Sequence, residues 1–231
     1  MSMRPSAPSC YVPAVDLFGR SWAALREVVA GLAGEDFQKP CGCTGWLIRD
    51  LVCHLIIDAQ DVLITLVTPS DSPPTRNSVT YWEVVESLPT DDPLDALTTR
   101  LAAAYGDPSL LKFHLDDLGS AAGRAGELAN RDARVSTRGQ VLTVRDYLDA
   151  YVFEWTLHHL DLIAHLPDAP GPPAEGLAFS RNLLETAAGA ALPASWADVD
   201  ALLIGTGRRP ATAAEEADLR TTDARVPLIL T

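Results

Sequence analysis

Two histidines and a glutamate in apolar surroundings are the residues of this chain best suited to chemistry. In the segment FEWTLHHLDL, residues 153–162, Glu154 and His158 stand four positions apart. Residues four apart share one face of an α-helix, so both side chains are predicted to project the same way. His54 adds a second imidazole from the apolar segment RDLVCHLIID, residues 49–58. Two imidazoles and a carboxylate can hold zinc or nickel and leave one coordination position open for water or substrate.

The same residues have a second interpretation that needs no metal. An ion pair between Glu154 and His158 would satisfy both groups inside a helical core, where an unpaired carboxylate is costly. Spacing alone leaves these two interpretations open. Asp161, three residues after His158, could orient that imidazole. Asp58, four residues after His54, could play the same part or serve as an alternate ligand.

Four further residues are candidates for binding a substrate or thiol. Arg49 and Arg145 open two apolar segments and could contact an acidic ligand, but pairing with the aspartate that follows each is the favoured interpretation. Trp46 and Trp155 could form pocket walls, although large aromatic residues pack in the core by default.

Two other features carry weaker signals. His159 points about 100° away from His158 around a helix, so the two side chains cannot readily bind one ion. Cys41 and Cys43 form a C-x-C pair. This is a weak metal or redox signal, because zinc knuckles use a two-residue gap and a second pair. Loop or part-buried thiols are therefore the favoured interpretation.

Length, hydrophobic content and net charge limit the classes of protein to which this chain can belong. The chain has 231 residues, of which 47% are hydrophobic, enough for one ordinary domain with a substantial core. Its formal net charge of −13 would repel phosphate backbones, so we expect no nucleic-acid partner. The start of the chain lacks a signal-peptide pattern, and no apolar run reaches membrane-spanning length. We therefore expect a cytoplasmic protein without a membrane partner, either a monomer or a homodimer.

Apolar residues recur at spacings of three and four along much of the chain, the pattern of amphipathic α-helices. Thr143 followed by Asp146 resembles a capping box and marks a helix start. Strand-like alternation is scarce, so the fold class is predicted to be mostly α, a four-helix bundle. The expected bundle helices cover residues 15–32, 48–67, a third segment broken at 106–108 (94–105 and 109–129), and 144–166.

The C-terminal part differs from the bundle. It opens with a Pro-rich linker, contains two shorter predicted helices at 177–191 and 199–204, and closes with GTGRRP and a polar end. Arg208 and Arg209 could line a pocket if this tail folds back, but a solvated charge pair is the favoured interpretation. The predicted regions are a flexible N-terminal arm at 1–11, a metal-binding four-helix bundle at 12–167 and a helical C-terminal extension at 168–231.

Two segments resemble the signatures of a known family. CTGWLIRDLVCHL, residues 43–55, is similar to the second-helix signature of the mycothiol-dependent maleylpyruvate isomerase N-terminal domain, part of the DinB-like superfamily. VRDYLDAYVFEWTLHHLDLIAHL, residues 144–166, is similar to its fourth-helix signature, in which a Glu, a His four later and an Asp three beyond recur. GTGRRP, residues 205–210, resembles a run near the C-terminus of many short actinobacterial members. The resemblance covers about residues 12–210.

This resemblance implies a DinB-like four-helix bundle that binds zinc, or nickel as the alternative ion, through His54, Glu154 and His158. It also implies mycothiol as cosubstrate. The chain departs from the family at Leu47, where a Thr or Ser usually caps the second helix, a loss of about 1 kcal/mol. The isomerase also carries a sterol-carrier-like C-terminal domain that contributes to its active site, whereas the tail after Asp168 is shorter and predicted to be helical.

The favoured function is therefore that of a metal-dependent transferase or isomerase using a low-molecular-weight thiol, expected to be mycothiol, with a small electrophilic substrate. A non-catalytic binding or regulatory module stabilised by the metal is the first alternative. A thiol-independent metallo-hydrolase is the second, with Asp58 or Asp61 as the candidate general base.

Overall fold

The computed structural model describes residues 14–85 and 93–230, so the predicted flexible arm at 1–11 lies outside the described residues. None of the described helices is long and apolar enough to cross a membrane. The α-helices are α1 (Ala14–Gly31), α2 (Ile48–Leu66), α3 (Pro93–Tyr105), α4 (Pro108–Leu128), α5 (Val144–Ile163), α6 (Ala174–Ala188), α7 (Asp198–Gly205) and α8 (Ala213–Leu219). The other elements are a 3-10 helix (Gly34–Gln38) and the short strands β1 (Val84–Val85), β2 (Arg134–Thr137), β3 (Gln140–Thr143) and β4 (Ile229–Leu230).

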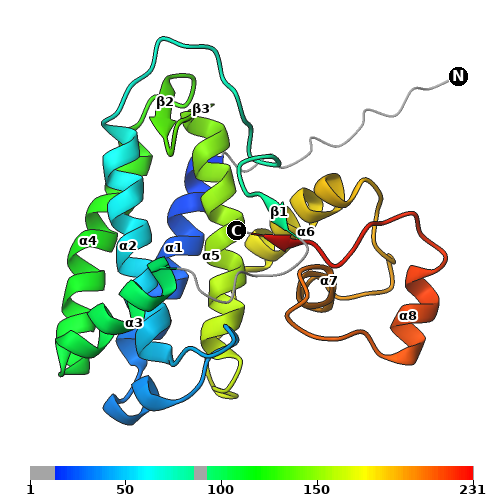
Figure 1. Ribbon diagram of the computed structural model, residues 1–231, viewed down its shortest axis with the longest axis horizontal. Helices are drawn as coiled ribbons and strands as arrows, with labels where there is room; N and C mark the ends of the chain where they lie inside the picture. The colour runs from blue at the N-terminus through cyan, green and yellow to red at the C-terminus, as the bar shows by residue number, and fades with distance from the viewer. Residues whose placement is uncertain (1–13, 86–92, 231) are drawn as a thin grey trace, which may run out of the picture.

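Helices α1, α2, α4 and α5 run alongside one another as a bundle (Figure 1). Trp22 of α1 stacks on Trp155 of α5 with ring centroids 3.9 Å apart, and the ring of Phe18 lies 4.9 Å from Trp155. All three side chains are buried, and each contributes roughly 2–3 kcal/mol by leaving water. The prediction of a mostly α, DinB-like four-helix bundle is confirmed.

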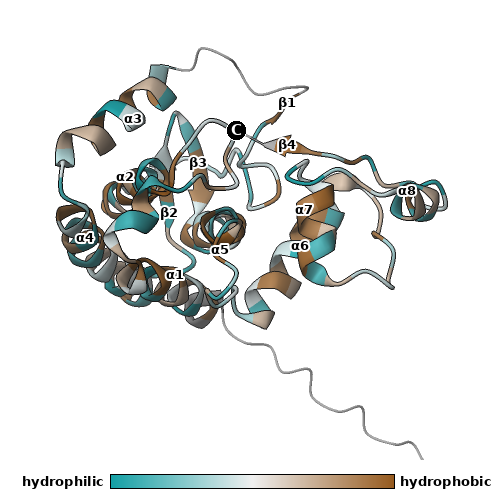
Figure 2. Ribbon diagram, turned by 90° about the horizontal axis from the view of Figure 1, so that it is seen from below, coloured by the Kyte–Doolittle hydropathy of each residue, from teal (hydrophilic) through white to brown (hydrophobic). Residues whose placement is uncertain are grey.

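The third predicted helix is in fact two helices. α3 packs against α2 outside the bundle, and α4 takes the bundle position (Figure 2). The Asp107 carboxylate accepts a hydrogen bond from the Ser109 N–H at 2.9 Å, and Pro108 occupies the first turn of α4. Both features are typical of a helix start, so the predicted break at 106–108 begins a new helix rather than kinking one.

The two helices that carry the candidate ligands begin differently. α5 follows directly on the β2–β3 hairpin, and Thr143 Oγ1 accepts a hydrogen bond from the Asp146 N–H at 3.0 Å, as predicted. At the start of α2 Leu47 offers no side-chain cap. A side-chain bond there runs the other way, from the Leu47 N–H to the Asp50 carboxylate at 2.9 Å. The helix therefore lacks the capping bond that a hydroxyl at Leu47 would supply.

The C-terminal extension packs on the side of α5 that faces away from the bundle core (Figure 1). α6 and α7 form a second apolar cluster with α5, and β4 returns to pair antiparallel with β1. Helix α8 was not predicted from the sequence, although Thr212 and Glu215 form a capping box at its start. The residues that α5 contributes to this cluster are Phe153, Leu157 and Leu160.

Asp149 of α5 makes the stability of this fold depend on pH. Its Oδ1 is buried without a hydrogen-bond partner among the described residues. Burial raises the pKa of this carboxyl to about 6, against the opposing charge of Arg131. The unfolded value is about 4, so the folded state holds this proton more tightly, and the resulting stability is lost as pH rises from about 4 to 6. We expect Asp149→Asn to raise the free energy of unfolding at pH 7 by about 1–2 kcal/mol.

Urea unfolding at several pH values between about 4 and 8 measures this effect as the difference between variant and wild type. The matched control is Asp71→Asn at an exposed position, which we expect to leave the free energy of unfolding unchanged. A difference between Asp149→Asn and wild type that is the same at pH 4 and pH 7 would contradict the assignment.

Candidate metal centre

The candidate ligands come from the facing sides of α2 and α5. His54 lies in the second turn of α2, and Glu154 and His158 lie one turn apart on α5. His158 Nε2 is 3.0 Å from Glu154 Oε1, and His54 Nε2 is 3.8 Å from the same oxygen. The two imidazole rings meet edge to face with centroids 4.8 Å apart. The fold thus brings the three predicted ligands to one point.

The spacing and donor types of this group fit a divalent ion. The three ligand atoms all lie within 4.8 Å of one another. Zinc bound tetrahedrally at about 2.1 Å places neighbouring ligand atoms about 3.4 Å apart. The separations of 3.0 and 3.8 Å lie on either side of that spacing. The side chain of His54 is 26% exposed, that of Glu154 17% and that of His158 10%, so a small molecule can approach from the His54 side.

The electrostatics of the site favour a charged Glu154–His158 pair. Burial lowers the pKa of His158, but Glu154 and Asp161 outweigh it and raise the pKa to about 10. Burial raises the pKa of Glu154, but the two histidines outweigh it and hold the pKa well below its usual range. The ion-pair interpretation and the metal interpretation therefore share one geometry, and ion binding here would release a proton.

The second nitrogen of His158 faces a buried carboxylate. His158 Nδ1 lies 3.1 Å from Asp161 Oδ2, close enough for the Nδ1–H to donate a hydrogen bond. Burial raises the pKa of Asp161, but the bond from His158 and the charge of Arg208 outweigh it and lower the pKa to about 2. Asp161 therefore stays ionised. Its contact with Nδ1 of His158 turns Nε2 of the same ring toward Glu154, which is the orienting position expected for Asp161 from the sequence.

Cys43, for which a loop or part-buried thiol was the favoured interpretation, lies beside the same nitrogen. Cys43 Sγ is 3.8 Å from His158 Nδ1 and 3.5 Å from Asp161 Oδ2. These three residues form a second group of potential ligand atoms. Arg208 already binds both oxygens of Asp161, however, so its positive charge disfavours a cation in this second group.

Asp58 and Trp46 border His54. Asp58 Oδ2 lies 3.6 Å from His54 Nε2 and is buried without a hydrogen-bond partner among the described residues. Burial raises the pKa of Asp58, against the opposing charge of His54. An unsatisfied buried oxygen beside a candidate ligand fits the alternate-ligand position predicted for Asp58. The Trp46 ring meets His54 in an edge-type contact with centroids 5.5 Å apart, so it lies beside the candidate ligands.

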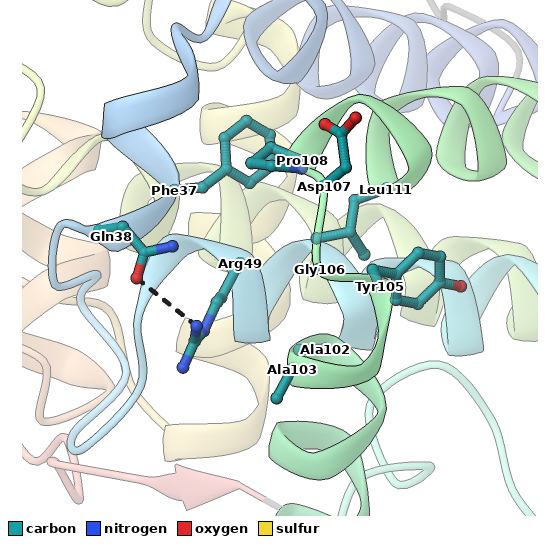
Figure 3. Close-up of a pocket in the computed structure, with 10 residues that line it drawn as sticks. All are labelled: Phe37, Gln38, Arg49, Ala102, Ala103, Tyr105, Gly106, Asp107, Pro108 and Leu111. Atoms are coloured by element: carbon teal, nitrogen blue, oxygen red, sulfur yellow. Dashed lines mark hydrogen bonds between the residues drawn. The ribbon is translucent and has the colours of Figure 1, made fainter.

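Arg49 lines a pocket that does not include the candidate ligands. Its side chain lines a small pocket between the 3-10 helix and the α3–α4 turn, as Figure 3 shows. There it donates a long hydrogen bond of 3.5 Å to Gln38 Oε1 and lies 3.6 Å from Asp50 Oδ1. The aspartate contact is the pairing that the sequence analysis favoured for Arg49.

Arg145 and Trp155 also lie away from the candidate ligands. Arg145 stands nine residues before Glu154, about 13 Å along the helix axis. Its guanidinium pairs with Asp132 at 3.4 Å. Trp155 is fully buried in the bundle core against Trp22, its default interpretation.

The two tail arginines are not a solvated charge pair, so that prediction is wrong. Arg208 folds back onto Asp161, with Nε 2.9 Å from Oδ1 and Nη2 3.0 Å from Oδ2. Arg209 pairs within the extension, at 2.8 Å from both Asp200 and Glu215. Arg208 reaches Asp161 because α7 and the turn after it bring the tail back against α5, whereas the partners of Arg209 come from α7 and α8.

Residues 18–163 match the family described as the mycothiol maleylpyruvate isomerase N-terminal domain. The match covers well over half of the 231 residues. The chain belongs to this family. The resemblance stated from the two helix motifs is thereby confirmed. No curated protein and no solved structure gave a significant match.

The mycothiol maleylpyruvate isomerase N-terminal domain spans most of α1 through α5 in this chain. It therefore contains His54, Glu154, His158 and Asp161. The match ends at the end of α5, so Arg208 reaches the site from a segment outside the matched domain. Members of this family are associated with mycothiol, so the family suggests a mycothiol-related role for this chain.

Proposed function

We propose that this chain is an enzyme that binds a divalent ion, zinc by its ligand set, through His54, Glu154 and His158. With that ion it joins a low-molecular-weight thiol, mycothiol, to a small electrophile. The proposal is supported by the convergence of two imidazole nitrogens and a carboxylate at one partly exposed point, in a chain of a mycothiol family. Three protein ligands leave a position open, as in catalytic rather than structural zinc sites.

A bound ion would supply the acidity that keeps a thiol sulfur in its nucleophilic thiolate form. The contribution of the protein is positioning and charge. Asp161 holds Nδ1 of His158, so the other nitrogen of the ring faces Glu154. Trp46 packs against the His54 ring, with centroids 5.5 Å apart, and restricts its movement. Glu154 contributes the negative charge that a dication needs in a largely buried site.

An isomerase and a transferase would begin with the same step, attack of the thiol sulfur on an electrophilic carbon. In an isomerase, rotation about the former double bond and elimination would return the thiol unchanged. In a transferase the adduct leaves, and the thiol is consumed in proportion to product. The fate of the thiol therefore distinguishes the two reactions.

The test uses zinc-loaded protein with mycothiol, with glutathione or without thiol, against a cis-unsaturated keto acid, an aryl halide and an epoxide. Products and free thiol are followed by mass spectrometry. We expect turnover that requires mycothiol and falls at least about 100-fold in Glu154→Gln, a loss of a few kcal/mol of transition-state stabilisation. A protein that binds zinc but neither binds nor turns over a thiol would contradict the proposal and favour a metal-stabilised binding module.

One observation supports the hydrolase alternative. The buried, unsatisfied Oδ2 of Asp58 beside His54 could accept a proton from water, whereas Asp61 already accepts hydrogen bonds from Tyr147 and Tyr151. Hydrolysis of an activated ester without added thiol, lost in Asp58→Asn, would favour this second function.

A further inference from the structure

Three segments that are far apart in the sequence meet at Asp161. His158 lies one turn back on α5, Gly42 belongs to the loop before α2, and Arg208 follows α7. The Gly42 N–H donates to the Asp161 carbonyl at 2.8 Å. A Cβ on Gly42 would lie 2.6 Å from Asp161 Oδ1 and 2.8 Å from its Cα. The Asp161 side chain, only 2% exposed, is therefore enclosed on all of these sides.

Arg208 binds the Asp161 carboxylate through two guanidinium nitrogens. Its Nε lies 2.9 Å from Oδ1 and 3.2 Å from Oδ2, and its Nη2 lies 3.0 Å from Oδ2. A guanidinium fork of this kind fixes the plane of a carboxylate as well as its position. Arg208 is itself held in place, because Gly207 turns the chain just after α7 in a left-handed conformation (φ 74°) and the Arg209 N–H donates to the Leu203 carbonyl at 3.0 Å.

We propose that Arg208 is a positioning residue of the metal centre: it fixes Asp161, and Asp161 fixes His158 with Nε2 directed at Glu154 and His54. The inference rests on the metal site proposed above. A carboxylate that accepts the Nδ1–H leaves the lone pair of the imidazole on Nε2, where an ion needs it. The C-terminal extension, which lies outside the matched domain, is thereby a functional part of the centre.

The positive charge of Arg208 stabilises the buried Asp161 carboxylate, in addition to the orienting effect of the guanidinium fork. Without the guanidinium, Asp161 would be a buried carboxylate with His158 as its main charged partner, and such an unbalanced group is costly. The carboxylate would then relax toward solvent or another donor, and the imidazole would lose its orientation. This predicts an effect on ion affinity that is separate from the stability of the extension.

The experiment measures zinc affinity by competition with a chromophoric chelator in wild type, Arg208→Gln, Asp161→Asn and the double variant. We expect each single substitution to weaken binding about 10–100-fold, the usual effect of losing a residue that orients a ligand. The double variant should bind zinc almost as tightly as the single variant with the lower zinc affinity, because both substitutions break the same chain of contacts. Arg208→Lys keeps the charge without the fork and should fall between wild type and Arg208→Gln.

Arg209→Gln is the matched control. It is the adjacent arginine and pairs with Asp200 and Glu215 inside the extension, so it should lower the melting temperature while leaving zinc affinity unchanged. The absorption spectrum of the Co²⁺-substituted proteins, which reports coordination geometry, should change in Arg208→Gln and not in Arg209→Gln.

Zinc affinity in Arg208→Gln equal to that of wild type would overturn this inference. A wild type that binds no ion would overturn it together with the metal site. Normal zinc affinities without thiol turnover would overturn the proposed reaction alone, and the Arg208 and Arg209 affinities would still decide the positioning role.

Discussion

Zinc is expected to be lost from His158→Ala and retained in His159→Ala. The two adjacent histidines are both buried but face different partners. His158 Nε2 lies 3.0 Å from Glu154 Oε1, whereas His159 Nε2 lies 3.0 Å from the Pro170 carbonyl. If the binding free energy of a zinc site is shared among its ligands, removing one costs about 3–4 kcal/mol, roughly 100–1,000-fold in affinity. His159→Ala removes a buried hydrogen bond instead, so it should cost about 1–3 kcal/mol of stability.

Elemental analysis of protein purified without chelator gives the metal content of each variant, and thermal unfolding with and without added zinc gives the response to the ion. Zinc at about 100 times its dissociation constant should stabilise wild type and His159→Ala by about 3 kcal/mol, and His158→Ala hardly at all. Equal zinc content in the two variants would contradict the assignment of His158 as a ligand. No zinc in any of the three proteins would leave Glu154 and His158 as a buried ion pair.

Gly126→Ala is expected to destabilise the protein markedly, because a methyl group at this position of α4 would clash with α1. A Cβ on Gly126 would lie 2.5 Å from Phe18 Cε1 and 2.9 Å from its Cδ1. Phe18 is fully buried and packed against Trp155, so its ring cannot move aside. Overpacking of this kind should cost about 2–3 kcal/mol. Chemical denaturation, with the slope checked for two-state behaviour, measures the loss.

Gly123→Ala provides the control one turn earlier on the same helix. Its Cβ would lie 3.6 Å from Trp22 Cδ1, an ordinary contact, so the gain in helix propensity should dominate. We expect a neutral effect or a stabilisation of up to about 1 kcal/mol. Equal destabilisation by the two substitutions would show that close packing of α1 on α4 is not the cause.

Local rules in the sequence predicted the parts of the site that depend on local geometry. The spacing of Glu154 and His158 fixes a shared helix face, and the Thr143 cap sets where α5 begins. The apolar surroundings of His54 indicate an inward-facing residue, and a four-helix bundle gives it a partner helix. Each of these predictions needs only helix periodicity, capping chemistry and one rule of helix packing.

Contacts set by tertiary structure could not be predicted in this way. Arg208 and Arg209 are chemically identical neighbours, and only the turn after α7 decides which one reaches Asp161. Cys43 stands 115 positions before His158, and its place beside the ring follows from how the loop before α2 packs on α5. Trp155 adjoins Glu154 in sequence but points into the core, because successive helical residues lie about 100° apart.

The most direct test of the central claim is a crystal structure of the zinc-loaded protein with anomalous diffraction recorded at the zinc edge. We expect about one anomalous peak per chain, bonded to His54 Nε2, Glu154 and His158 Nε2 at about 2.0–2.2 Å, with one position open. A peak on the other side of the ring, at His158 Nδ1 with Cys43 and Asp161, would contradict both the proposed ligand set and the positioning role of Arg208.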